Sequence, residues 1–337
     1  MSDLKEFIAG MPKAELHMHL EGALEPSLVR IIAERNKLPV PPLIQEQGSG
    51  YSFNDLTSFL AVYYPVLAVL QTSSDYHDVA WSYLTKAHEQ NIVHAEMFFD
   101  PQAHTSRGVD FATVISGYHS AIVEARKKFR MSASLIMCFL RDMDAESAMQ
   151  TLTQALPYKD KIIGVGLDSD ERDNPPSKFA VVFERARTEG FRRTMHCNID
   201  QKDSIEHIRQ AVEEIGVDRI DHGTNIVEDA RLVRLIREKG IGLTCCPVSN
   251  AVVTADFKGA EMKRLLRDEG VLVTVNSDDP AYFRAYLCEN IGFLAERSAL
   301  AREDVLRLQR NAFEIAWITA EERVGFLALL EEYAACH

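Results

Sequence analysis

Short apolar segments alternate along the chain with longer amphipathic segments. The apolar segments number eight, and each has the length and β-rich composition of one buried strand. They are KAELHMHL, IVHAEMFF, SASLIMCFL, KIIGVGLD, FRRTMHCN, DRIDHG, IGLTCCP and VLVTVNSDDP, beginning at Lys13, Ile92, Ser132, Lys161, Phe191, Asp218, Ile241 and Val271. The segments between them, such as FATVISGYHSAIVEARKKF and DARLVRLIREKG, have helical spacing, and several end in glycine, a common helix stop. This alternation predicts an α/β fold, a (β/α)8 TIM barrel.

The segment between the first two predicted strands is longer than one crossover helix requires. It contains three helical patterns, PSLVRIIAERN, LTSFLAVYYPVLAVL and DYHDVAWSYLTKAHEQ, and a Pro- and Gly-rich loop near LPVPPLIQEQGSGYSF. We expect a helical insertion that partly covers the mouth of the barrel. The residues after Ala281 are expected to form further helices outside it. Because no linker or low-complexity segment marks a boundary, we expect residues 1–337 to form a single domain.

Composition excludes several classes of partner. The formal net charge of −13 argues against a basic face that grips nucleic acid, and it favours a neutral or cationic small substrate. No apolar run approaches the roughly 18 residues of a membrane span, and the N-terminus lacks the pattern of a secretory signal. Six scattered cysteines without C-x-x-C spacing indicate reduced thiols, so we expect a cytoplasmic protein.

Polar residues gather where the predicted strands end, which is where TIM barrels carry their chemistry. His17 and His19 are two residues apart, so a strand turns both imidazoles to one face. The later strand ends supply His196, His222, Asp168 followed by Ser169, Asp170 and Glu171, and the pair Asp278 and Asp279. Three imidazoles and a carboxylate around one point suit Zn²⁺ or a similar divalent ion, which lowers the pKa of a bound water. His222 is the natural neighbour to orient or deprotonate that water.

The segments PKAELHMHLEGAL, GVGLDSDE, RIDHG and VNSDDPAYF together resemble the adenosine/adenine deaminase family of the amidohydrolase superfamily. The resemblance covers essentially the whole chain in motif order and spacing. HLEG, FFDPQ, GLDSDE, PPSKF and NSDDPAYF make the chain most similar to the adenine deaminase branch. The resemblance implies a single metal-dependent deaminase domain with one Zn²⁺ per chain. The ligands that it implies are His17, His19, His196 and Asp278.

The same resemblance implies further roles in the site. His222 would position the metal-bound water. Asp279 would hydrogen-bond the N7 side of a purine, and the backbone at Ser169 would meet the N3 side. Glu21 lies where nucleoside-using relatives carry a ribose-contacting acid.

One position departs from the family pattern. The family carries His-Ala-Gly-Glu after the fifth strand, and its Glu donates a proton to purine N1. This chain has HCNIDQ, so Ile199 stands where the Glu belongs and Asp200 follows it. Asp203 is expected to cap the next helix, with Glu206 as its capping-box partner. Asp200 is therefore the predicted substitute proton donor.

The predicted function is zinc-dependent hydrolytic deamination of a 6-aminopurine base to hypoxanthine plus ammonia or an amine. Adenine and N6-substituted adenines such as cytokinins stay open as substrates, with free bases expected over nucleosides. The alternatives are an adenosine deaminase, and a purine-binding or regulatory protein that keeps the metal site without turnover. The zinc deaminases of another fold need P-C-x-x-C, which is absent here. The sequence does not indicate the oligomeric state.

The remaining histidines and the paired cysteines are interpreted as structural. His94 and His104 are expected at the rim or in the core, and Cys245–Cys246 as buried inert thiols. The rest are expected on helix surfaces or at the terminus: His88, His119, His207 and His337.

Overall fold

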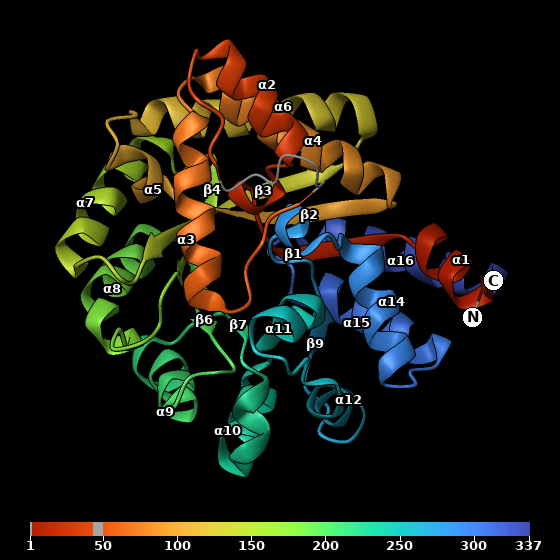
Figure 1. The fold of residues 1–337 in the computed structure, drawn as a ribbon. Helices are drawn as coiled ribbons and strands as arrows, with labels where there is room; N and C mark the ends of the chain where they lie inside the picture. The colour runs from red at the N-terminus through yellow and green to blue at the C-terminus, as the bar shows by residue number, and fades with distance from the viewer. Residues whose placement is uncertain (1, 43–49) are drawn as a thin grey trace.

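The computed structural model describes residues 2–42 and 50–337, and its core is a closed barrel of parallel strands (Figure 1). Near-continuous apolar runs form these strands because both of their faces are buried. The strands are β1 Lys13–His19, β2 Ile92–Phe99, β3 Ser132–Leu140, β4 Ile162–Asp168, β5 Arg192–Arg193, β6 His196–Cys197, β7 Arg219–His222, β8 Gly242–Cys245 and β9 Val273–Val275. The predicted TIM barrel is confirmed.

The barrel wall consists of two sheets rather than one. The first has the order β1-β2-β3-β4-β5 and the second the order β6-β7-β8-β9, so the fifth predicted strand is broken into β5 and β6. On one side the wall continues across Thr194, whose N–H donates to Val165 O at 3.0 Å. On the other, Asp278 closes it against β1: the N–H of His19 donates to Asp278 O at 2.8 Å, and the N–H of Asp278 to His17 O at 3.1 Å.

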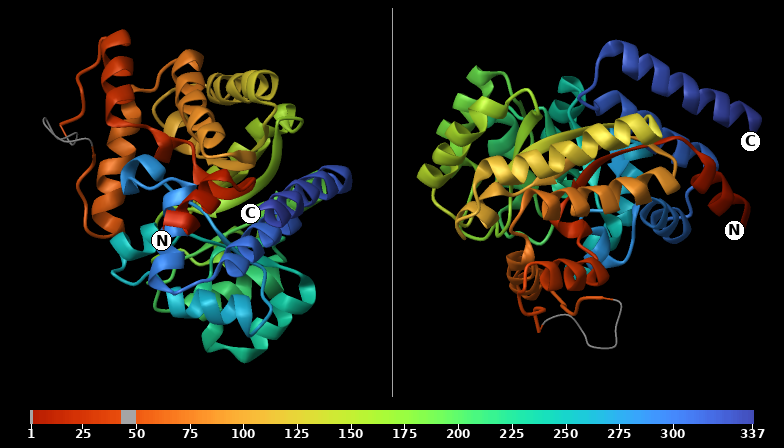
Figure 2. Two further views of the ribbon diagram at one scale, coloured as in Figure 1. Left: turned by 90° about the vertical axis from the view of Figure 1, so that its right-hand side faces the viewer. Right: turned by 90° about the horizontal axis from the view of Figure 1, so that it is seen from above.

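Helices surround the barrel (Figures 1 and 2). α10 shows why they form, since it buries Leu232 and Ile236, begins at the capping side chain of Asp229, and ends at Gly240 with φ 66°. The helices are α1 Ser2–Gly10, α2 Pro26–Arg35, α3 Leu56–Val66, α4 Ser73–Glu89, α5 Pro101–Thr105, α6 Phe111–Phe129, α7 Ala145–Ala155, α8 Ala180–Glu189, α9 Ser204–Arg209, α10 Ala230–Lys239, α11 Pro247–Val253, α12 Gly259–Arg267, α13 Pro280–Phe283, α14 Leu287–Arg297, α15 Arg302–Ile315 and α16 Ala320–Cys336.

The insertion between β1 and β2 supplies α2, α3 and α4, and α3 crosses in front of the barrel mouth (Figure 1). Phe59 of α3 stacks with Phe283 at a centroid distance of 5.4 Å, and the hydroxyl of Tyr64 donates to Ser169 Oγ at 2.8 Å. The helical cover over the mouth is therefore as expected. Of the expected Pro- and Gly-rich loop, residues 43–49 lie outside the described residues.

The C-terminal helices pack on the outside of the barrel, as expected. α15 lies against β1 and β9, and α16 follows it on the exterior (Figure 2). The ring of Tyr333 in α16 packs against that of Phe7 in α1 at a centroid distance of 5.3 Å, so the two ends of the described chain lie side by side. No helix in the described part of the chain is long and apolar enough to cross a membrane.

Candidate active site

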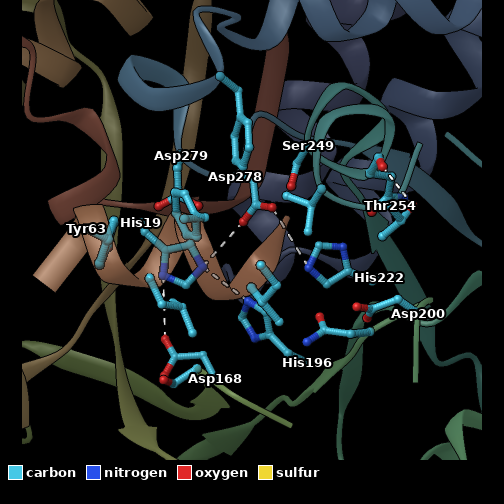
Figure 3. Close-up of a pocket in the computed structure, with 18 of the residues that line it drawn as sticks. His19, Tyr63, Asp168, His196, Asp200, His222, Ser249, Thr254, Asp278 and Asp279 are labelled. Atoms are coloured by element: carbon cyan, nitrogen blue, oxygen red, sulfur yellow. Dashed lines mark hydrogen bonds and ion pairs between the residues drawn. The ribbon is translucent and has the colours of Figure 1, made fainter. Parts of the chain in front are cut away.

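Four histidines and an aspartate converge at the C-terminal end of the barrel, and Figure 3 shows three of the histidines with the aspartate. One ligand atom each from His17, His196, His222 and Asp278 lies within 4.8 Å of the others, and all four residues are buried. His19 joins them, since its Nε2 lies 3.1 Å from His196 Nε2 and 3.5 Å from Asp278 Oδ1. His17 Nε2 lies 3.1 Å from the same Asp278 oxygen. Imidazole nitrogens with one carboxylate are a donor set that fits Zn²⁺.

The backbone turns sharply where these side chains leave the strands. Ser169, His222 and Asp278 follow or end strands, and each has a positive φ, at 72°, 60° and 65° respectively. Residues with a side chain seldom adopt this conformation, and where they do they cluster at functional sites. At each of these three positions, the turn directs the residue at the end of the strand toward the barrel mouth.

A second layer of polar residues orients the imidazoles. His17 Nδ1 lies 2.9 Å from Thr244 Oγ1 and 3.1 Å from Thr244 O, so Nδ1 carries the proton and Nε2 is left for a metal. Thr244 and Thr194 donate to the two oxygens of Asp221 at 2.7 and 2.8 Å. His196 Nδ1 lies 3.5 Å from the same carboxylate. Such outer contacts fix the ring orientation of metal-ligating histidines.

The protonation states of all but one of these groups suit metal binding; at His17 the neighbouring Asp278 outweighs burial and raises the pKa of the imidazole. Burial lowers the pKa of His19 to about 4 and lowers the pKa values of His196 and His222 as well. Burial alone would raise the pKa of Asp278, but the neighbouring His17 outweighs it and holds that pKa well below its usual range. Neutral imidazoles and an ionised carboxylate are the forms that bind a divalent cation.

A pocket of about 660 Å³ that opens to solvent lies above this cluster. His19, His196, His222 and Asp278 line its polar part, together with Asp279 and Ser169. Apolar side chains line the rest: Leu56, Phe59, Leu60, Tyr63, Ile199, Val253 and Phe283. α3 thus contributes much of the apolar wall.

Three further carboxylates line the pocket and are buried: Asp100, Asp168 and Asp279. Burial raises the pKa of Asp168 to about 7, and burial together with Asp278 raises the pKa of Asp279 well above its usual value. Asp168 Oδ2 lies 3.5 Å from Nδ1 of His19 and so orients that ring. Asp100 directly follows β2, as Ser169 follows β4, and this position at a strand end is the signal in the sequence that could have identified it.

Ile199 and Asp200 both line the pocket, in the loop after β6. Ile199 is buried, whereas Asp200 is exposed and accepts a hydrogen bond from Gln201 Nε2 at 3.1 Å. Figure 3 shows the Asp200 carboxylate turned toward the pocket. The structure thus brings Asp200 to the pocket wall without a direct contact to the metal cluster.

A buried polar network holds this loop. Arg141 NH1 donates to His196 O at 2.8 Å, and Glu171 Oε2 accepts the Asn198 N–H at 2.8 Å. His207 Nδ1 lies 2.5 Å from Glu171 Oε1. The expectation that His207 lies on a helix surface is wrong, because this imidazole is buried behind the loop as the partner of a buried carboxylate.

The expected capping box at α9 is also wrong. Asp203 occupies the N-cap position, but its side chain makes no capping hydrogen bond. Glu206 instead pairs with Arg209, with Oε1 2.6 Å from NH2. The guanidinium at the next helical turn is the stronger partner for an exposed carboxylate.

Glu21 is not among the residues that line the pocket. Its Oε1 accepts hydrogen bonds from His104 Nε2 and from the hydroxyl of Tyr118, both at 2.9 Å. Glu21, which was expected to contact the substrate, therefore belongs to a buried hydrogen-bond network in this structure instead. His94 and His104 are buried, as expected for core residues.

The adenosine deaminase family model matches residues 12–333. The chain belongs to the adenosine deaminase family. It is 47% identical over its whole length to an uncharacterized deaminase of Schizosaccharomyces pombe, which is itself fully covered. It is 43% identical to the adenine deaminase of Hahella chejuensis, with 99% of this chain and all of that protein covered.

Solved structures of the family agree with this assignment. The adenine deaminase of Arthrobacter aurescens superposes with a TM-score of 0.91 at 38% identity, covering 97% of this chain and 100% of that one. As a member of this family, the chain is a hydrolytic deaminase. The clustered imidazoles and carboxylates at the barrel mouth are what a deaminase needs to bind a metal and to activate water.

Proposed function

We propose that this protein is a zinc-dependent deaminase of a 6-aminopurine base, which it hydrolyses to hypoxanthine plus ammonia or an amine. The observation that carries the proposal is the convergence of four imidazoles and Asp278 beneath an open pocket, which three of these imidazoles line. The relatives named adenine deaminase, at 43–44% identity over nearly the full chain, support a free base as substrate.

In this proposal His17, His19, His196 and Asp278 hold one Zn²⁺ per chain. The bound ion would activate water for attack on the purine C6. His222 Nε2 lies 3.9 Å from Asp278 Oδ2, beside the ligands, and burial lowers the pKa of this imidazole. A neutral imidazole in that place accepts the proton that the attacking water loses.

Asp279 and Ser169 would bind the edges of the purine ring. Oδ1 of Asp279 is buried and has no hydrogen-bond partner among the described residues. Because the pKa of Asp279 is raised, its carboxyl donates to N7. The backbone N–H of Ser169, placed by the turn after β4, would meet N3.

Asp200 is the proposed proton donor to N1, in place of the acid that Ile199 replaces. Its support is its place on the pocket wall, with the carboxylate turned inward. Two other acids near this loop, Glu171 and Glu206, are engaged with His207 and Arg209 respectively, and Asp203 is not among the residues that line the pocket.

An N6-alkylated adenine is a second candidate substrate, and one observation favours it. Ile199 places an apolar side chain on the pocket wall at the position of the family's acid, in a pocket that also exposes Leu60 and Val253. An alkyl group on the leaving amine would bury apolar surface there.

We further propose a single-domain, cytoplasmic enzyme whose partner is the small-molecule purine and not nucleic acid. All six cysteines lie in the described residues and are free, which supports a reducing compartment.

The test is to incubate the zinc-loaded protein with adenine, an N6-alkyladenine and adenosine, and to follow hypoxanthine and inosine by chromatography. We expect hypoxanthine from at least one base and much slower turnover of adenosine. Comparable rates for adenosine would indicate an adenosine deaminase. Purine binding without any product would indicate the regulatory alternative and overturn the proposal.

A further inference from the structure

Asp100 occupies a helix N-cap position but does not cap. It directly follows β2 and precedes Pro101 at the start of α5, and its side chain makes no capping hydrogen bond. Asp144 is a matched contrast, since it holds the N-cap position of α7 and its carboxylate accepts the Ser147 N–H at 2.6 Å. The Asp100 carboxylate is therefore free of the usual structural task of an Asp in that place.

The Asp100 side chain lines the pocket and is 2% exposed. Its Oδ1 has no hydrogen-bond partner among the described residues, and the same holds for both carboxylate oxygens of Asp168 beside it. Burial and the neighbouring Asp168 raise the pKa of Asp100 well above its usual value, and the carbonyl oxygen of a protonated carboxyl still accepts a hydrogen bond. One carboxylate oxygen of Asp100, one of Asp168 and a ring nitrogen of His19 lie within 4.8 Å of one another. A buried acceptor without a donor is costly, so an unpartnered carboxyl among the residues that line a pocket indicates a donor on the ligand.

The proposed contacts, taken together with the strand order, imply which part of a purine lies nearest to Asp100. The proposed contacts put N7 beside Asp279, after the eighth strand of the barrel, and N3 beside Ser169, after β4. N1 faces the loop that follows β6. The remaining edge of the ring carries N9, and it faces the arc of the barrel formed by β1, β2 and β3. Asp100 directly follows β2, the middle strand of this arc.

We propose that Asp100 accepts a hydrogen bond from the N9–H of a free purine base, and that this contact makes the enzyme select bases over N9-substituted nucleosides. The inference rests on the proposed function and extends it to the choice of substrate class. A nucleoside has no hydrogen on N9, so it would leave the buried oxygen unpaired. Sites that hydrogen-bond a substrate group reject analogues that lack the group far more strongly than apolar pockets reject a missing methyl.

Glu21 has a different role in this arrangement. Because Glu21 Oε1 is engaged with His104 and Tyr118, it does not compete for the same N–H. It also accepts the backbone N–H of Asp100 at 3.3 Å, which helps to hold that residue in place.

The experiment compares kcat/KM for adenine and 9-methyladenine in the zinc-loaded enzyme and two near-isosteric variants. The parent should prefer adenine by at least about 100-fold. Asp100→Leu removes the acceptor without making room, and should lower kcat/KM for adenine by roughly 10–100-fold while leaving that for 9-methyladenine nearly unchanged. Asp100→Asn keeps a carbonyl oxygen and should retain most of the preference. Asp144→Ala, at the N-cap that does cap, should leave the preference unchanged.

A second measurement keeps the test decisive if a variant turns over slowly. Calorimetric binding of hypoxanthine and 9-methylhypoxanthine to zinc-loaded protein should show the same loss of discrimination in Asp100→Leu, with zinc content equal to that of the parent. Equal kcat/KM for adenine and 9-methyladenine in the parent, or full preference retained in Asp100→Leu, would overturn the inference while the deaminase function stood. Absence of turnover with every 6-aminopurine base would instead overturn the proposed function.

Discussion

Ile199 and Asp200 are neighbours in the chain with different surroundings. Ile199 is buried against the pocket, and Asp200 lies exposed at its rim. The N–H of Asn198 and the carbonyl of Ile199 are both hydrogen-bonded, the latter by Asn225 Nδ2 at 2.9 Å. The backbone before Asp200 is therefore held, and its side chain has a defined place from which to reach a purine.

Replacing Asp200 by Asn keeps the side-chain volume and removes the titratable proton. If Asp200 protonates N1, kcat should fall by roughly two to four orders of magnitude with the zinc content unchanged. Asp203→Asn, in the same loop but outside the pocket lining, is the matched control and should be as active as the parent. A fully active Asp200→Asn enzyme would show that the proton comes from elsewhere.

His19 should make the stability of the metal-free protein depend on pH. Its pKa is about 4 when folded and about 6.5 in an unfolded chain, so the unfolded state binds more protons between these values. The free energy of unfolding should therefore decrease as the pH falls from about 6.5 toward 4, by up to about 3 kcal/mol. Urea unfolding of chelator-treated protein measures this.

His19→Asn should show a shallower loss of stability over the same pH range. His337→Asn, which changes the exposed terminal imidazole, serves as control and should follow the parent. If the free energy of unfolding changed with pH in the same way for the parent and for His19→Asn, the lowered pKa of His19 would not be the cause of the pH dependence.

The loop between β6 and α9 depends on a carboxylate from a different loop. Glu171 lies in the loop after β4, and its carboxylate is fully buried. It pairs with Arg141, accepts a hydrogen bond from the Asn198 N–H and contacts His207. Since Arg141 also donates to the carbonyl of the metal-cluster residue His196, the network connects the loop directly to the site.

Glu171→Gln should therefore destabilise the fold by about 3 kcal/mol, because it leaves the buried guanidinium of Arg141 without its counter-charge. It should also lower kcat by displacing the loop that carries Asp200. Glu206→Gln is the matched control on α9, where an exposed pair with Arg209 contributes less than about 1 kcal/mol. Chemical denaturation and steady-state kinetics test both, and equal effects of the two changes would refute the role of Glu171.

The strands were predictable because buried parallel strands are nearly continuous apolar runs. The break between β5 and β6 was not, because it depends on the strands with which the two parts of FRRTMHCN pair, β4 for the first and β7 for the second. The burial of His207 was missed for a related reason. His207 looks like a surface residue in its own segment, and only its meeting in space with Glu171 makes the two a buried pair.

The metal cluster spans the place where the barrel closes. His17 and His19 belong to the first sheet, His196 begins the second, and Asp278 lies at the junction between β1 and the eighth strand of the barrel. An ion bound by all of them would connect the two sheets in addition to the backbone hydrogen bonds that close the wall.

Metal removal should consequently lower thermal stability as well as abolish activity. Zinc at a thousandfold excess over its Kd would stabilise the fold by about 4 kcal/mol, which corresponds to a change in Tm on the order of 5–10 °C. Elemental analysis should find about one zinc per chain, and scanning calorimetry before and after chelation measures the shift in Tm. The double variant His17→Ala/His19→Ala should have no zinc and no chelator response; full zinc content in it would disprove the ligand assignment.

The proposed metal ligands lie far apart in the sequence, and this has a consequence for the synthesis of the protein. His17 and Asp278 are 261 residues apart, yet their side chains lie 3.1 Å from each other. A ribosome that has finished β1 has made two of the proposed ligands, but the fourth emerges only after most of the chain has been translated. A partly synthesised chain therefore presents an incomplete donor set, and loading of the ion belongs to the final stage of the protein's maturation.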